Sequence, residues 1–173
     1  KEREVLLVLD NLEHLFDDAG GAIALLVEIL RQAPGVRVLV TSRERLNLYD
    51  EVVFDVSGLE VPTGDASAPQ ESSAVALFLQ SAHRVKRDFH LAGKDQESVA
   101  HICRMVGGMP LAIELASAWT RQYSCGQIAA QIEKDLDFLT SPYQDLAAGH
   151  RSLRAVFERS WSLLSPEVQG AFL

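Results

Sequence analysis

The sequence predicts an α/β segment followed by an all-helical segment, and three observations support this prediction. Two short apolar runs, VLLVL at 5–9 and VRVLV at 36–40, have the length and composition of strands. A stretch with helical periodicity separates these runs, which gives the order strand, helix, strand. From Ser73 onward, apolar residues recur at the three- and four-residue spacing that is typical of helices.

The run at 5–9 is unbroken and leads directly into Asp10. We expect a strand that is buried on both faces, as in a parallel sheet covered by helices. A carboxylate at the end of such a strand lies where open α/β sheets bind ligands, and it suits a phosphate-bound Mg²⁺. From this segment alone, a second interpretation stays open and is the favoured one. In that interpretation Asp10 caps the helix that follows.

A helix and two further strands are expected next. The helix should end near Ala33, because Pro34 and Gly35 break it. It connects 5–9 to 36–40 in a right-handed βαβ unit, and a third short strand is expected at 52–56. The helix is predicted from apolar residues at Ile23, Leu26, Val27 and Leu30.

A stretch rich in Pro, Gly, Ser and Ala covers residues 57–72, and it predicts a domain boundary. The expected divisions are an α/β part at 1–60, a linker at 61–72, a helical part at 73–148 and a final part at 149–173. Within the helical part, Asp95 is a candidate N-cap, Gly107 a C-terminal stop, and Pro110 the first residue of a helix.

Composition limits the classes of function. The net charge is -8, from 24 acidic and 16 basic residues, which argues against a nucleic-acid-binding surface because phosphates require basic residues. No apolar stretch is long enough to span a membrane, and no signal-peptide pattern is present. Cys103 and Cys125 lack the spacing of metal ligands, and the five histidines are scattered. These features predict a cytoplasmic location.

Four segments follow one another along the chain: LLVLDNLEHL at 6–15, VLVTSRERL at 38–46, GGMPLAIELAS at 107–117 and RSLRAVFERSWSLLSPEVQGAFL at 151–173. Their order resembles the STAND signal-transduction ATPases, which are relatives of NB-ARC domains. The resemblance is greatest to bacterial transcriptional regulators with a STAND core between a DNA-binding domain and helical repeats. It implies part of a P-loop NTPase parallel sheet from the Walker B strand onward, then a helical subdomain, and the start of a winged-helix subdomain at 149–173.

The resemblance also implies an ATP/ADP-binding site with Mg²⁺. Asp10 is similar to the Walker B acid, which holds Mg²⁺ through water. Thr41, Ser42 and Arg43 resemble the sensor segment, in which a cation approaches the γ-phosphate. Gly108 and Pro110 resemble the GxP motif, whose proline packs against adenine. Without the resemblance, Arg43 would be interpreted as pairing with nearby acids or solvent.

Two departures from the family pattern affect the expected activity. Asn11 stands where many members of the family have a second acid; an amide can position a water but cannot act as a general base at neutral pH. Glu13 is the nearest carboxylate that could replace it, but on a helical turn its side chain would point in a different direction from that of residue 11. We therefore expect a switch that binds ATP and hydrolyses it slowly. The phosphate-binding motif GxxxxGK[ST] is absent from the sequence and is expected upstream of Lys1. We therefore expect a fragment that neither binds ATP tightly nor hydrolyses it, whereas the complete protein is an ATPase.

The expected partners are other parts of the parent chain: the P-loop segment, a DNA-binding domain and helical repeats. Without the P-loop strand, apolar strand edges are left unpaired, which predicts a rearranged third strand or intermolecular pairing into oligomers. A second interpretation is a protein-interaction scaffold of the same fold that has lost hydrolysis. A third, a direct DNA-binding domain, is disfavoured by the charge and by the lack of a basic recognition helix.

Overall fold

The structure is a computed structural model that describes residues 4–15, 21–63, 72–141, 151–162, 164 and 166–171. The chain divides into two compact units, at 1–56 and 57–173, and each is described by itself. Most of the expected linker at 61–72 and the expected boundary between residues 148 and 149 lie outside the described residues.

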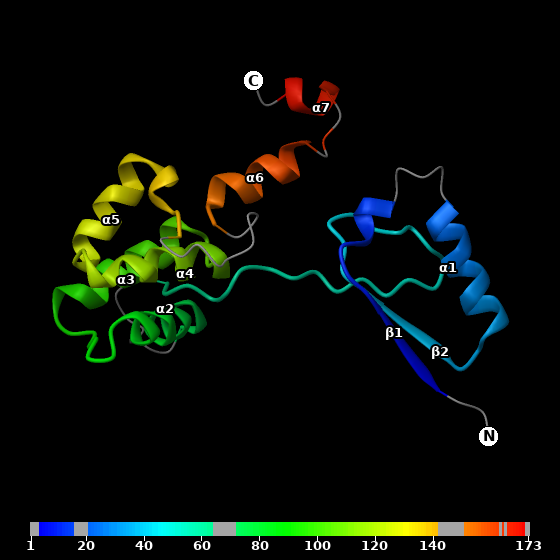
Figure 1. The fold of residues 1–173 in the computed structure, drawn as a ribbon, viewed down its shortest axis with the longest axis horizontal. Coiled ribbons are helices and arrows are strands. Elements are labelled where there is room, and N and C mark those ends of the chain that lie inside the picture. The colour runs from blue at the N-terminus through cyan, green and yellow to red at the C-terminus, as the bar shows by residue number, and fades with distance from the viewer. Residues whose placement is uncertain are drawn as a thin grey trace. The chain divides into compact units, whose positions relative to one another are not determined.

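The first unit contains the predicted strand, helix, strand unit. Strands β1 (Val5–Leu9) and β2 (Val36–Val40) pair in parallel and in register along their whole length. Helix α1 (Gly21–Gln32) connects them and lies beside the sheet (Figure 1). It ends immediately before the Ala33–Gly35 turn, in which the Val36 N–H donates to the Ala33 carbonyl at 2.9 Å. A short 3₁₀ turn, η1 (Leu12–Leu15), follows β1.

The prediction that β1 is buried on both faces is wrong for the described unit. Leu6 and Val8 on β1 are 62% and 57% exposed, and Leu39, which pairs with Val8, is 55% exposed. Side chains alternate between the faces of a strand, so these three residues share one face of the sheet. Leu7 and Val38 on the other face are half-buried. The described part of the unit therefore leaves one apolar face of the sheet uncovered.

The predicted third strand at 52–56 is also wrong. Residues 51–56 make no ladder with any described strand, and Val52, Phe54 and Val56 are 93%, 86% and 88% exposed. A strand needs a neighbour for its backbone hydrogen bonds, and apolar alternation alone does not supply one. Intermolecular pairing through the free edges stays a prediction.

The second unit is helical, as predicted. Its core lies among its first four helices, where α2 (Ser73–Val85) packs on α4 (Pro110–Ala118) and α3 (Lys94–Met105) packs on α5 (Cys125–Lys134) (Figure 1). The largest fully buried side chains include Phe78, Ile102, Ile113 and Ile128, one from each of these helices. The other described elements of this unit are η3 (Trp119–Arg121), η4 (Leu136–Phe138), α6 (Leu153–Ser162) and α7 (Pro166–Gly170).

Local capping signals account for several helix boundaries. The Ser72 hydroxyl accepts from the Val75 N–H at the start of α2, and Ser124 and Gln127 form a capping box on α5. Pro110 begins α4, as expected. The expected N-cap at Asp95 is wrong: α3 begins at Lys94, and Asp95 lies in its first turn, where a negative charge complements the helix dipole.

An ion pair connects η4 to α6. The Arg154 guanidinium donates to the Asp137 carboxylate, and this hydrogen bond holds the pKa of Asp137 below its ordinary value. The Leu153 N–H also donates to the Leu139 carbonyl at 3.0 Å. The start of α6 is therefore held by a charged pair to η4 and by a backbone hydrogen bond to Leu139, the residue after η4.

This pair predicts a pH dependence. Because the pKa of Asp137 is lower in the folded state, its stabilising contribution is present above the unfolded-state pKa and is lost as pH falls through the folded-state value. Asp137→Asn is expected to lower the urea midpoint slightly at neutral pH and to have no effect once Asp137 is protonated. Glu158→Gln is the control. Glu158 also lies beside Arg154, but at 4.0 Å it is too far away for a hydrogen bond, so its replacement should change the urea midpoint less. A difference between wild type and Asp137→Asn that persists in acid would contradict the prediction.

Candidate functional site

The carboxyl ends of the two strands bring Asp10 and Thr41 together. Leu9 pairs with Val40, so the residues that follow them leave the sheet side by side. The Thr41 hydroxyl donates to an Asp10 carboxylate oxygen and accepts from the Asn11 N–H at 3.0 Å. The Leu12 N–H donates to the Thr41 carbonyl at 3.0 Å. Thr41 therefore orients the carboxylate and fixes the turn that follows it.

Asn11 occupies a backbone conformation that restricts its residue type. Its φ is +56°, in the left-handed region, which asparagine tolerates better than most residues other than glycine. The turn at Asn11 leads the chain from the end of β1 into η1. Asn11 is thus suited to the backbone at this position, in addition to lacking the carboxylate of a general base.

Glu13, which follows in η1, has a buried side chain. Its side chain is 5% exposed, and its Oε1 lies 3.5 Å from Nε of Arg43, whose side chain is 40% exposed. The other carboxylate oxygen, Oε2, is buried and makes no hydrogen bond in the structure. The structure therefore brings together two residues, Glu13 and Arg43, that the sequence assigned to different roles.

Ser42 shapes the loop after β2. Its hydroxyl oxygen accepts from the Glu44 N–H at 3.2 Å. Further along, the Glu51 carboxylate accepts from the N–H groups of Leu46 and Leu48, at 3.1 and 3.2 Å. These side chains satisfy the backbone of the loop that carries Arg43 away from the strand end.

Gly108 and Pro110 lie in the second unit, at the corner between α3 and α4. Gly107 and Gly108 have φ of +59° and +68°, and Pro110 is the exposed first residue of α4. The corner closes on α3 through hydrogen bonds from the Gly107 N–H to the Arg104 carbonyl and from the Gly108 N–H to the Cys103 carbonyl, each 3.0 Å. This arrangement is the one expected for a helix–glycine–proline–helix corner.

Residues 58–61, which we call the strap, dock on this corner, and sequence reasoning missed them. The Leu59 N–H donates to the Gly108 carbonyl at 2.8 Å. A Cβ on Gly108 would lie 2.0 Å from the Leu59 carbonyl oxygen, and one on Gly58 would lie 2.4 Å from the Gly107 oxygen. Leu59 and Val61 pack against the helical core. The two-residue spacing of Leu59 and Val61 could have indicated this contact, but the composition of the surrounding stretch predicted a linker.

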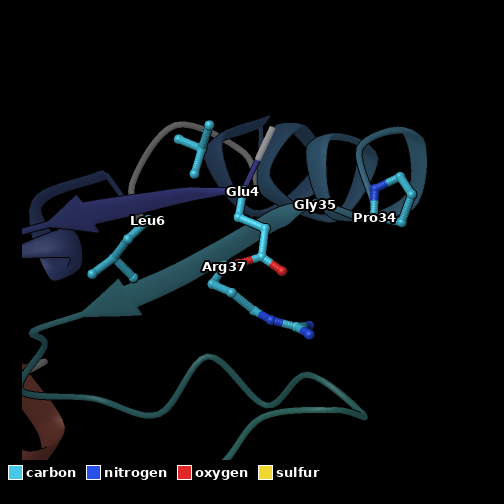
Figure 2. Close-up of a pocket in the computed structure, with 6 residues that line it drawn as sticks. Glu4, Leu6, Pro34, Gly35 and Arg37 are labelled. Atoms are coloured by element: carbon cyan, nitrogen blue, oxygen red, sulfur yellow. The ribbon is translucent and has the colours of Figure 1, made fainter. Parts of the chain in front are cut away.

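A shallow depression of about 320 Å³ lies at the amino ends of the strands (Figure 2). Its lining includes Glu4 and Arg37, whose side chains lie on the same side of the sheet (Figure 2). None of the site residues predicted from the sequence lines it. Open α/β sheets bind ligands at the opposite, carboxyl ends of their strands, so we assign no role to this depression.

The Asp10 carboxylate offers oxygen atoms of the kind that Mg²⁺ prefers. The metal usually takes one or two carboxylates from the protein and completes its shell with water and phosphate oxygens. The exposed Asp10 carboxylate, oriented by Thr41, fits that mode. The described residues contain no group of three or more His, Cys, Asp or Glu side chains that could hold a metal by themselves.

Comparison with known proteins shows similarity along almost the whole chain. A Mycobacterium tuberculosis protein with the provisional name HTH-type transcriptional regulator Rv0890c is 34% identical over 170 residues, which are 98% of this chain. Its Mycobacterium bovis counterpart, Mb0914c, matches equally well. The chain spans only 18% of the length of these relatives. The uncharacterized M. tuberculosis protein Rv0894 is 34% identical over 164 residues, or 39% of its own length.

The similarity to these relatives runs through both units of the chain. No protein-family model matches the chain, and no solved structure matches it. None of the helices in the described part of the chain is long and apolar enough to cross a membrane.

Proposed function

We propose that this chain is part of a nucleotide-controlled switch of the STAND type in a transcriptional regulator. The observation that carries the proposal is the joining of Asp10 to Thr41 at the carboxyl ends of two parallel strands, with Arg43 following in the same loop. The context of a regulator is supported by the names of relatives that match 98% of the chain. Those relatives are several times longer than the chain, so the activity belongs to a larger protein.

Each residue has a distinct role in the proposed site. Asp10 holds Mg²⁺ through water, and Thr41 keeps the carboxylate oriented toward it. Arg43 contacts the terminal phosphate, because a guanidinium binds phosphate oxygens in two places. The bound nucleotide supplies the phosphates that distinguish the two states of the switch.

The alternative is a scaffold of the same fold that works by protein contacts. Asn11 favours it, because position 11 combines an amide side chain with a left-handed backbone and offers no base. The exposed apolar face of the sheet is the surface that such a scaffold would use. The two proposals differ in whether the complete protein binds nucleotide.

Calorimetric titration of the complete protein with ATP, with and without Mg²⁺, tests the proposal. Asp10→Asn is expected to weaken Mg²⁺-dependent binding at least about tenfold, the loss typical when support for a bound metal is removed. Asp50→Asn, which changes an exposed acid in the same unit, is the matched control and should bind normally. The 173-residue chain alone should bind weakly, because it lacks the phosphate-binding motif.

Two other results of the titration would contradict the proposal in part or in whole. Equal binding by wild type and Asp10→Asn would remove Asp10 from the site. If the complete wild-type protein does not bind nucleotide, the switch proposal is overturned in favour of the scaffold.

A further inference from the structure

Glu13 is the one charged residue in the buried class among those the structure describes. Burying a carboxylate is costly unless it is paired and hydrogen-bonded. Here one oxygen faces Arg43 Nε at 3.5 Å, and the other has no hydrogen-bond partner. Burying a carboxylate in this way costs free energy of folding, so it requires an explanation beyond the packing of η1.

The pair connects the two strand ends. Glu13 lies in η1, which follows β1, whereas Arg43 lies in the loop that follows β2. Glu13 is fixed by burial, while the Arg43 side chain is 40% exposed. The buried Glu13 carboxylate therefore provides a fixed partner for the exposed Arg43 guanidinium.

We propose that Glu13 is a positioning residue: it holds the Arg43 guanidinium at the carboxyl end of β2 and so sets the preference for a nucleoside triphosphate over a diphosphate. This inference rests on the proposed function, in which Arg43 contacts the terminal phosphate. A guanidinium fixed through its Nε keeps a defined orientation, whereas a long, unrestrained side chain loses rotamer freedom each time it engages a ligand. In this role Glu13 acts through Arg43 and takes no proton from water.

A double-mutant cycle in the complete protein tests the inference. The variants are Glu13→Gln, Arg43→Gln and the combination, and the measurement is the dissociation constant for ATP and for ADP. Each single variant is expected to reduce the preference for ATP about tenfold, and the double variant should be no worse than Arg43→Gln alone. Glu28→Gln is the matched control, because Glu28 pairs with Arg31 on the exposed surface of α1.

Hydrogen exchange of the ligand-free protein provides a readout that does not depend on nucleotide. Glu13→Gln and Arg43→Gln should each speed exchange in the loop at 41–46 by a similar factor, with no further increase in the double variant. The strands should keep their protection, which shows that the variants fold. Glu28→Gln should leave the loop unchanged.

The outcomes separate the competing roles of Glu13. If Glu13→Gln slows turnover but leaves both the ATP preference and the loop exchange unchanged, Glu13 is a general base and the positioning role is overturned. Additive effects of the two single variants would also overturn it. If the wild-type protein binds no nucleotide, the proposed function fails, and the exchange cycle alone decides whether Glu13 positions Arg43.

Discussion

Replacing Gly108 by alanine is expected to destabilise the helical unit by about 2–4 kcal/mol, from left-handed backbone strain, a lost hydrogen bond and lost packing of the strap. Gly108 has φ +68°, which strains any residue with a Cβ. The new Cβ would also lie 2.0 Å from the Leu59 carbonyl oxygen, which is backbone and cannot rotate away. The strap must therefore leave the corner.

Gly107→Ala separates the two contributions. Gly107 has a similar φ of +59°, but a Cβ there would meet nothing within 4 Å. It should lose only about 1–2 kcal/mol, the cost of the left-handed conformation. Urea unfolding followed by circular dichroism measures both variants, and hydrogen exchange at Leu59 reports on the strap directly. Equal losses in stability, with Leu59 still protected in Gly108→Ala, would show that the strap does not depend on Gly108.

The features that sequence reasoning predicted correctly are those fixed by local pattern. The apolar runs at 5–9 and 36–40 form strands, and the breakers at Pro34 and Gly107 end helices as expected. The contact between Asp10 and Thr41 was not predicted as such, although the sequence named both residues and the parallel pairing of the two strands brings the residues after them together. That juxtaposition needed only the pairing of the two strands.

The features it missed depend on contacts between distant segments. Glu13 follows the left-handed turn at Asn11 and pairs with Arg43, thirty residues further along the chain. The strap was not predicted because its composition is typical of linkers, although two apolar residues within it pack on the core. The strand expected at 52–56 had the right alternation but found no neighbouring strand. Periodicity describes a segment's own faces and does not identify the segment that covers them.

Phe78→Ala is expected to cause the largest loss of stability, about 3–5 kcal/mol, because it removes a fully buried aromatic side chain and leaves a cavity. Phe78 is 0% exposed and lies on α2, the helix that packs on α4. Its ring lies 6.3 Å from that of Phe89, in a tilted arrangement. The loss should appear as a lower urea midpoint of the helical signal with little change in slope, because the folded state keeps its compactness.

Phe54→Ala is the control, because it removes the same aromatic ring from an exposed position instead of a buried one. Phe54 is 86% exposed in the first unit, so removing its ring should change stability by no more than about 0.5 kcal/mol in either direction. If Phe54→Ala were as destabilising as Phe78→Ala, residues 51–56 would be packed in solution against a surface such as the open face of the sheet. The same pair of variants thus measures the core of the helical unit and tests whether the unpaired apolar segment stays exposed.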